Sequence, residues 1–362
     1  MKRLLLAGGG QAHVFVLRAL ANWKVEIDAT LVTPSDRLIY TGMLPGWIAG
    51  HYPLPSLTIP LAPLLQAANV RLVTARIASL DLQRRIAFTD RDEAIEFDLL
   101  SIATGPAPNY DAIEGAREHA LPLRPLERFV TQWQRIELRA QSAPQPFRIT
   151  VVGSGAGGVE VAFAARYRMP NAHVQLVTGA APILPGHSMR ARSLALAMLH
   201  RCGVELIDAE ATHIECDNVT LSDGSVLPSD ATLLMTGAAP DRWLRDTGLA
   251  TDDAGFLAIN SCLQSTSHEF VFAAGDAATM IDAKRPKSGV YAVRAGPRLA
   301  KNLLAKITAA PLQEWQPQRR ALYLLSTGAK HAIASWGTLA FEGDWVWHWK
   351  NRIDRAYIAK FK

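Results

Sequence analysis

The sequence predicts an α/β protein built from two similar units, because one order of strand, glycine-rich turn and helix occurs twice. In the first copy the apolar residues 4–6 lead into Gly8-Gly9-Gly10 and then into an amphipathic segment at 14–20. In the second copy residues 149–152 lead into a turn whose glycines are Gly153, Gly155 and Gly158. An apolar run that enters such a turn and continues as a helix is typical of a buried parallel strand that ends beside a helix N-terminus.

A second repeated pattern lies downstream of each turn and supports the same plan. Residues 97–105 and 229–237 each contain an acid, an apolar strand and a Thr-Gly pair, with Ala and Pro following. Because both patterns recur in the same order, we expect the two units to share one architecture.

Length and composition indicate a folded protein of two domains. The chain has 362 residues, 49% hydrophobic and 20% charged, which exceeds one ordinary core and argues against disorder. The apolar run after residues 1–3 stops at Gly8, so we expect no export signal. No window of roughly 18 uncharged apolar residues occurs, so we expect no membrane-spanning segment.

Cys202, Cys216 and Cys262 lack metal-ligand spacing and a close partner, so we expect reduced thiols, no metal site and a cytoplasmic protein.

Most of the net charge lies at the C-terminal end. The formal net charge is +5, and residues 345–362 contain five Lys or Arg residues against one Asp. Such a basic patch binds anionic lipid as readily as nucleic acid. We expect a membrane surface as the partner of this segment, and no nucleic acid.

Periodicity and turn residues predict the remaining elements. Four prolines from Pro53 to Pro63 exclude a long regular helix there. We expect helices at 126–141, 188–202 and 290–306, and strands at 29–33, 70–80, 85–89, 204–207 and 270–274. Alternating residues predict antiparallel strands at 321–326, 331–336 and 339–347. A helix at 349–362 should follow, with Trp349, Ile353, Ala356, Tyr357 and Phe361 on one face.

The two turns match a dinucleotide-binding pattern unequally. In G-x-G-x-x-G the first glycine permits the turn, the second admits a pyrophosphate and the third allows close helix packing. The second turn supplies all three glycines, whereas His13 occupies the third place of the first turn. Thr33-Pro34-Ser35 and Thr178-Gly179 stand at the strand ends where an acid usually binds a ribose. The sequence therefore leaves NADH and NADPH undecided, with Arg190 or Arg192 available for a 2′-phosphate.

Together with both Thr-Gly patterns and Gly275-Asp276, these turns resemble the two-dinucleotide-domain flavoproteins, the pyridine nucleotide-disulfide oxidoreductase superfamily. The resemblance implies two Rossmann-like dinucleotide-binding domains, one for FAD and one for NAD(P), with the second inserted in the first. It places the FAD domain at 1–112 and 246–310 and the NAD(P) domain at 113–245. A C-terminal segment of antiparallel strands and a basic, Trp-rich tail occupies 311–362.

Within this superfamily the disulfide reductases carry a Cys-x4-Cys pair in the first helix region. Residues 37–45 contain no cysteine, so a thiol relay is excluded, and the three cysteines elsewhere are expected to be structural. The chain resembles type II NADH dehydrogenases and, more closely, a bacterial branch found fused to or encoded beside selenide, water dikinase. The residues that carry this finer resemblance are 43–52, 286–294, 335–337 and 347–355.

The resemblance also implies which residues meet the cofactors. The amides of Gly9 and Gly10 should bind the FAD pyrophosphate, Asp276 a ribityl hydroxyl, and the helix that opens near Ser288 should point its positive end at the flavin. His13 would support this turn or be a hydrogen-bonded histidine at a helix start. The full FAD set is Gly8, Gly9, Gly10, His13, Thr33, Pro34, Thr41, Gly42, Leu44, Pro45, Ile77, Ala103, Thr104, Gly105, Gly275, Asp276, Lys287 and Ser288. The NAD(P) set is Gly153, Ser154, Gly155, Gly158, Thr178, Thr236 and Gly237.

Two residues are expected to act in catalysis. Glu160 follows the second turn, where related enzymes place a carboxylate near the nicotinamide, although an ordinary helix-start acid is the alternative. Lys287 would add positive charge beside the flavin, or would be a solvated surface lysine. No acid–base triad is expected, because hydride transfer depends on position and field.

The expected activity is an FAD-dependent transfer of electrons from NAD(P)H to a quinone-like or other small non-disulfide acceptor. Gly289 and Val290 replace an Ala-Gln pair that type II NADH dehydrogenases carry at the quinone edge, so the acceptor stays open. A reductase of selenium metabolism and a non-catalytic FAD-binding redox partner are the alternatives. Trp336, Trp345, Trp347 and Trp349 beside basic residues suit a membrane interface, with core packing or a homodimer contact as the other readings. The expected location is cytoplasmic, or peripheral on the inner face of the membrane.

Overall fold

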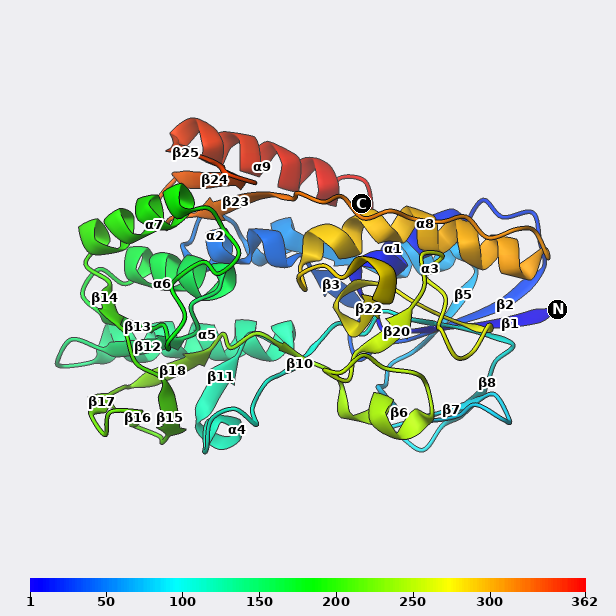
Figure 1. The fold of residues 1–362 in the computed structure, drawn as a ribbon, viewed down its shortest axis with the longest axis horizontal. Coiled ribbons are helices and arrows are strands. Elements are labelled where there is room, and N and C mark those ends of the chain that lie inside the picture. The colour runs from blue at the N-terminus through cyan, green and yellow to red at the C-terminus, as the bar shows by residue number, and fades with distance from the viewer.

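Two five-stranded parallel sheets form the framework of the protein, whose computed structural model describes all of residues 1–362 (Figure 1). The first sheet has the order β21-β9-β1-β2-β5, and the second has the order β11-β18-β12-β13-β14. The first comprises β1 (Lys2–Ala7), β2 (Ile27–Val32), β5 (Val70–Val73), β9 (Leu99–Ile102) and β21 (Val271–Ala273). The second comprises β11 (Ala120–Pro122), β12 (Arg148–Val152), β13 (His173–Val177), β14 (Glu205–Ile207) and β18 (Ala231–Leu234).

The chain order of these strands shows an insertion. β21 pairs with β9 in parallel, with Val271 opposite Leu100. Along the chain, all five strands of the second sheet lie between β9 and β21, so the second unit is inserted within the first. The predicted fold class, two α/β units with the second inserted in the first, is confirmed.

Helices cover the sheets and bring their N-termini to the glycine turns. On the first sheet, α1 (Gln11–Leu20) packs against α8 (Gly289–Ile307). Gly296 makes this approach possible, because a Cβ there would lie 2.5 Å from Cδ2 of Phe15. The other long helices are α3 (Ala62–Ala68), α5 (Leu126–Ser142), α6 (Ala156–Arg168) and α7 (Met189–Cys202). The ends of α5, α7 and α8 differ from the predicted ones by no more than one residue.

Small antiparallel sheets occupy equivalent places in the two units. β6 (Ile77–Asp81), β7 (Ile86–Thr89) and β8 (Ala94–Glu96) form one, and β15 (Ala211–Ile214), β16 (Asn218–Leu221) and β17 (Val226–Pro228) form the other. Two-stranded pairs are β3 (Arg37–Ile39) with β4 (Thr58–Pro60), β20 (Leu257–Ile259) with β22 (Ala278–Met280), and β10 (Ala107–Pro108) with β19 (Ala238–Ala239). The short helices are η1 (Thr41–Met43), α2 (Leu44–Ile48), η2 (Leu54–Leu57), α4 (Ala116–His119), η3 (Arg242–Thr247), η4 (Gly275–Ala277) and η5 (Ile281–Ala283).

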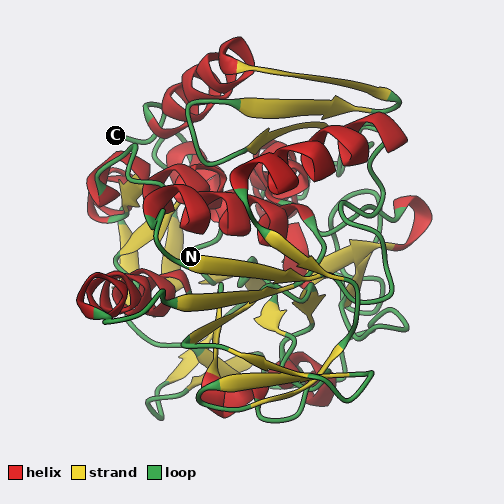
Figure 2. Ribbon diagram, turned by 90° about the vertical axis from the view of Figure 1, so that its left-hand side faces the viewer, coloured by secondary structure: helices red, strands yellow, loops and turns green.

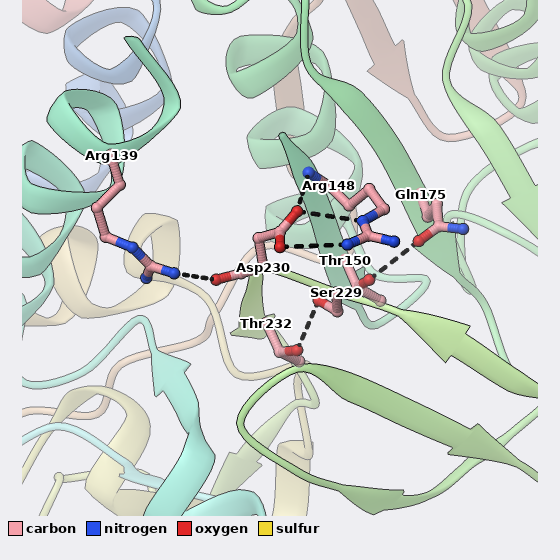
Figure 3. Close-up of polar contacts among 7 residues, drawn as sticks. All are labelled: Arg139, Arg148, Thr150, Gln175, Ser229, Asp230 and Thr232. Carbon is pink, nitrogen blue, oxygen red and sulfur yellow. Dashed lines mark hydrogen bonds and ion pairs between the residues drawn. The ribbon is translucent and has the colours of Figure 1, made fainter. Parts of the chain in front are cut away.

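The acid of each repeated pattern holds one end of its sheet. The Asp98 carboxylate accepts hydrogen bonds from the backbone amide of Arg3 at 2.7 Å and from its Nη2 at 3.0 Å. The Asp230 carboxylate likewise accepts from the amide of Arg148 at 2.8 Å and from its Nε at 3.1 Å (Figure 3). Arg139 donates to the Asp230 carbonyl at 3.0 Å. These contacts lie at the strand ends opposite the glycine turns, so the repeated acids stabilise the sheets and belong to no ligand site.

The C-terminal segment differs from the prediction in one respect. β23 (Leu322–Ser326), β24 (Ala332–Trp336) and β25 (Leu339–Gly343) form the expected antiparallel sheet, but the helix α9 (Asp344–Ile358) begins five residues before the predicted start. The third strand predicted to reach 347 is therefore wrong in its last four residues. In Figure 2 this sheet lies at the top of the molecule, and a layer of helices separates it from the parallel sheets.

The predicted apolar face of this helix is also wrong. Trp349, Ile353 and Ala356 are exposed, whereas Tyr357 and Phe361 are buried. The buried face of α9 instead includes the charged pair Lys350 and Asp354, which satisfy each other at 2.7 Å. Apolar periodicity placed the wrong face inward because it counts a lysine and an aspartate as surface residues. No helix of the chain combines the length and apolar character needed to cross a membrane.

Candidate functional site

The first glycine turn packs directly on the end of β9. Gly8 has φ +93°, and a Cβ there would lie 2.6 Å from Cα of Thr104. At Gly10 a Cβ would lie 2.2 Å from the Ala103 carbonyl oxygen. Only glycine fits these positions. The helix α1 that starts here has neither a side-chain cap nor an acid in its first turn, so its first amides are available to an anion such as a pyrophosphate.

His13 explains how this turn works without its third glycine. The fully buried ring lies beneath the turn, with Nδ1 2.5 Å from the Gly8 carbonyl oxygen and Nε2 2.8 Å from Oγ of Ser101. Burial lowers the pKa of His13 to about 4, so the ring is neutral at physiological pH. With no exposed surface, the ring positions the turn from beneath, as expected for the alternative role of a hydrogen-bonded histidine at a helix start.

Other expected FAD residues divide into surface and core groups. Thr41 in η1 faces the start of α8, because a Cβ at Gly289 would lie 3.9 Å from its Oγ1, whereas a Cβ at Gly42 would lie 2.7 Å from Cζ of Tyr40. Thr33 is buried against Gly9, while Pro34 next to it is exposed. The side chains of Leu44, Pro45 and Ile77 are buried in the core, so only the backbone of these three residues can reach a cofactor.

Asp276 and Arg124 lie close enough beside the first turn to influence each other's charge, without forming an ion pair. Burial raises the pKa of Asp276, and the nearby guanidinium of Arg124 opposes this. Burial also lowers the pKa of Arg124, which has no hydrogen bond or ion pair with any other residue. Its Nη1 would lie 3.4 Å from a Cβ at Gly105. A largely buried cation with free donors beside an uncapped helix fits the phosphates of a dinucleotide, because unpaired buried charge is costly.

Sequence reasoning missed Arg124. The available signal was its position as the single charged residue in the apolar run 120–126. A charge inside such a run has to find a partner when the chain folds.

Lys287 is half-buried near Asp276, so it is not the solvated surface lysine that was the alternative to its catalytic role. Its ammonium group donates to the Ala278 carbonyl at 2.7 Å and to Oγ1 of Thr279 at 2.8 Å. It also lies 3.7 Å from the centre of the Phe256 ring. Burial lowers the pKa of Lys287 to about 8. These three partners occupy the ammonium group, so Lys287 fastens the segment behind Asp276, and Ser288 next to it opens α8 with no side-chain cap.

The second glycine turn satisfies all three roles of the motif. Gly153 has φ +139°, and a Cβ there would lie 2.4 Å from the Met235 carbonyl oxygen, just before Thr236. A Cβ at Gly158 would lie 2.0 Å from the Gly153 carbonyl oxygen, so α6 packs directly on the turn. Gly155 has open space at its Cβ position, and α6 lacks both a cap and a first-turn acid. This is the geometry of an open anion cradle.

A short ribbon turns the two cradles toward each other. β10 follows Thr104 and Gly105, β19 follows Thr236 and Gly237, and the two strands pair in antiparallel fashion. Oγ1 of Thr236 donates to the carbonyl of Asn109 at 3.3 Å. The carboxyl edges of the two parallel sheets therefore meet at this ribbon, which allows ligands at both edges to approach each other.

Glu160 lies where both units and the C-terminal segment meet. Its Oε1 accepts the backbone amide of Ser326 in β23 at 2.8 Å. Burial raises its pKa to about 7, the nearby Lys350 ammonium and the Ser326 amide oppose this, and Asp354 adds to it. The Lys350 ammonium also donates to the Gly42 carbonyl of η1. A titratable carboxyl group is thus placed between the second glycine turn and the η1 turn of the first unit.

Asp354 extends this cluster into the first unit. Its carboxylate accepts hydrogen bonds from Lys350 at 2.7 Å and from the Tyr40 hydroxyl at 3.1 Å. Burial, followed by the charge of Asp354, raises the pKa of Tyr40 far above its usual range. Sequence reasoning found Glu160 but neither Lys350 nor Asp354, because they lie nearly two hundred positions away in the tail.

Two facing glycine cradles, three uncapped helix N-termini and a half-buried acid between them define a flavoprotein oxidoreductase with one site for FAD and one for NAD(P)H. Residues 2–296 match the family model described as pyridine nucleotide-disulphide oxidoreductase, and the chain belongs to this family. The predicted superfamily, the cofactors and the enzyme class, an FAD-dependent NAD(P)H dehydrogenase-like oxidoreductase, are confirmed.

Relatives and solved structures of this kind cover most of the chain. The chain is 27% identical over 349 residues to demethylphylloquinone reductase NdbB of Synechocystis sp., covering 90% of this chain and 85% of that protein. It is 24% identical over 289 residues to NADH dehydrogenase-like protein YutJ of Bacillus subtilis, covering 77% and 78%. The fold matches sulfide:quinone oxidoreductase of Aquifex aeolicus with a TM-score of 0.82 and 19% identity, covering 100% of this chain and 91% of that one. NDH2 of Plasmodium falciparum in complex with NADH matches with a TM-score of 0.82 and 12% identity, covering 99% and 97%.

Proposed function

We propose that the chain oxidises NAD(P)H through FAD and delivers the electrons to a quinone-like acceptor, with Glu160 as the proton donor to that acceptor. The observation that carries this proposal is the position of Glu160 between the second glycine turn and η1, next to the Lys350 ammonium. The name of the Synechocystis relative, a demethylphylloquinone reductase, supports a quinone as the acceptor.

The chemistry of a quinone explains why a carboxyl group is needed. Reducing a quinone to a hydroquinone consumes two protons as well as two electrons. Bound FAD supplies the electron chemistry, and the residues of the chain have to supply position, field and protons. With a pKa of about 7, Glu160 is partly protonated at neutral pH, which suits a general acid. Residues 37–45 contain no cysteine, which supports a non-disulfide acceptor.

Anaerobic stopped-flow absorption of the flavin band tests this function. NADH or NADPH should bleach the yellow holoprotein, and a short-chain quinone should restore its colour. Glu160→Gln should keep the bleaching step and slow the restoring step by roughly 10²-fold, the usual loss with a general acid. If neither coenzyme bleaches the flavin, the chain is a non-catalytic FAD-binding partner. Faster restoration by a selenium compound than by quinones would favour a role in selenium metabolism.

An exposed apolar surface on the C-terminal segment supports a peripheral position on a membrane. The hairpin of β24 and β25 exposes Trp336, Leu339 and Phe341, and α9 exposes Trp345, Trp349 and Ile353, each by 41% to 57%. Trp345 and Trp349 stack with their ring centres 6.3 Å apart. Contiguous exposed aromatic residues mark membrane or protein contacts. In Figure 1, α9 lies along the outer edge of the molecule, with β24 and β25 beside it. Trp347 is buried and takes no part in it.

Vesicle co-sedimentation tests this surface. Trp345→Ser with Trp349→Ser should reduce binding to vesicles of phosphatidylglycerol and phosphatidylcholine by at least about tenfold, because each aromatic side chain contributes a large apolar area. The control is Leu138→Ser, which removes a residue that is 63% exposed on α5, far from the tail in sequence. Equal co-sedimentation of all variants with the vesicles would contradict a membrane contact and favour a homodimer contact at this surface. Light scattering at several protein concentrations would detect such a dimer.

A further inference from the structure

The end of β13 is the place where a dinucleotide-binding unit normally distinguishes NADH from NADPH. An acid there binds the ribose 2′-hydroxyl of NADH, whereas basic residues nearby bind the 2′-phosphate of NADPH. In this chain Thr178 stands at the strand end, and residues 178–186 contain neither an acid nor a Lys or Arg. The end of β13 therefore carries neither the acid that usually selects NADH nor the basic residue that usually selects NADPH.

The neighbouring strand β14 supplies the missing acids. β13 and β14 pair in register with Val177 opposite Ile207, so the residues that follow them run side by side. The Thr178 amide donates to the Ile207 carbonyl at 3.0 Å, and the Gly179 amide donates to the Ala209 carbonyl at 3.1 Å.

Two carboxylates flank this extended pairing. Oγ1 of Thr178 donates to Oδ1 of Asp208 at 3.4 Å. A Cβ at Gly179 would lie 3.6 Å from Cγ of Glu210. Asp208 and Glu210 are both exposed and form no ion pair with a basic residue. Their negative charge therefore acts directly on whatever occupies the strand ends.

The two arginines that could have balanced these charges are engaged elsewhere. Nε of Arg192 donates to the Leu184 carbonyl at 3.3 Å. The guanidinium of Arg190 lies 6.0 Å from the centre of the Phe341 ring, on the side of β25. Neither arginine thus forms a hydrogen bond or ion pair with Thr178, Asp208 or Glu210, and the two carboxylates keep their charge uncompensated at this end of the second cradle.

From this arrangement we infer that Asp208 and Glu210 select NADH over NADPH, acting from β14 in place of the acid missing from β13. This inference rests on the proposed function, because it assigns the coenzyme of the second cradle. A neutral 2′-hydroxyl can donate a hydrogen bond to a carboxylate at this edge. A 2′-phosphate carries a charge of about −1.5 to −2 at pH 7, and two carboxylates with no intervening cation repel it.

Equilibrium binding of adenosine fragments tests the inference without any turnover. Isothermal titration calorimetry would compare ADP-ribose with its 2′-phosphate on the holoprotein. The wild type should bind ADP-ribose at least about tenfold more tightly. Asp208→Asn with Glu210→Gln should lower this ratio severalfold, mainly by improving the affinity for the 2′-phosphate. Glu205→Gln is the control, because it removes one charge from the opposite end of β14.

The outcomes separate this inference from the function beneath it. A wild type that prefers the 2′-phosphate, or a double variant with an unchanged ratio, would overturn coenzyme selection by β14 and leave the oxidoreductase intact. If neither fragment binds and neither coenzyme bleaches the flavin, the second glycine turn does not bind NAD(P)H, and the proposed function itself is refuted. Raising the salt concentration should narrow the wild-type ratio, since the carboxylates are exposed and screened.

Discussion

Gly155→Ala should weaken coenzyme binding by about tenfold or more while leaving the stability of the protein almost unchanged. Gly155 has φ −67°, which alanine adopts readily, and nothing lies within 4 Å of its Cβ position. That open space lies at the place in the motif where the backbone must approach a pyrophosphate. A methyl group there would collide with the bound pyrophosphate but with no atom of the protein. Titration of the holoprotein with NADH, followed by differential scanning fluorimetry, measures both effects.

Two neighbouring glycines provide matched controls for this result. Gly157→Ala adds the same methyl group to an exposed helical position with open space, and should leave binding intact while stabilising α6 by roughly 0.5–1 kcal/mol. Gly158→Ala places a Cβ 2.0 Å from the Gly153 carbonyl, and should destabilise the protein by about 1–3 kcal/mol or more through overpacking. Equal affinities in Gly155→Ala and Gly157→Ala would contradict a pyrophosphate on the second turn.

Lys350→Met should move the pH dependence of acceptor reduction upward, and Asp354→Asn should move it downward. Burial raises the pKa of Glu160 to about 7; within this value the Lys350 ammonium acts to lower the pKa and the Asp354 carboxylate acts to raise it. In the wild type the protonated, proton-donating form of Glu160 is lost as the pH rises through 7. Without the Lys350 ammonium, Glu160 stays protonated to a higher pH. Without the Asp354 charge, Glu160 loses its proton at a lower pH. The flavin reoxidation rate, measured with a quinone from pH 5.5 to 9, follows this change.

Each of these two substitutions should also destabilise the protein strongly. Lys350 and Asp354 are only 10% and 7% exposed, and breaking such a pair leaves one buried charge without its partner, at a cost of about 3–5 kcal/mol. Glu160→Gln in the same assay should abolish the transition near pH 7. A wild-type profile that is flat across this range, or one that shifts in the same direction in both variants, would remove Glu160 from the proton-donating role.

The linkage to folding has a defined sign. The carboxyl group of Glu160 has a folded pKa of about 7 against an ordinary value of 4.5, so the folded protein binds more protons than the unfolded chain between these values. Its contribution to stability therefore falls as the pH rises from 4.5 to 7. The stability loss in this window should disappear in Glu160→Gln, which provides a second measurement of the same group by thermal unfolding.

Local patterns were sufficient to predict the strand, turn and helix order, because each pattern is completed within a few neighbouring residues. Gly153 and Gly158 stand where the packing of the turn permits no side chain, Gly155 keeps space open for a ligand, and apolar runs predicted α5, α7 and α8 almost to the residue. The prediction failed in the tail, where Lys350 and Asp354 are buried. A rule that counts charged residues as surface cannot anticipate two charges that neutralise each other.

Among the functional residues too, local sequence patterns were predicted and contacts between distant residues were not. His13 was visible as an irregularity in the first turn, but its hydrogen bond to Ser101 joins residues that are 88 positions apart in the sequence. Arg124 and Asp276 approach each other only because the second unit is inserted between the parts of the first. Sequence spacing carries no information about such pairs.

By itself, the sequence determined that two nucleotide cradles exist and that no thiol relay connects them, since glycine spacing and the absence of cysteine are local facts. Only the tertiary structure decided that the cradles face each other, that the tail places Lys350 and Asp354 beside Glu160, and that Asp208 and Glu210 after β14 lie against Thr178 and Gly179 at the end of β13. The physical reason is that hydrogen bonds and charge pairs act over a few ångströms in space, whatever the separation of their residues along the chain.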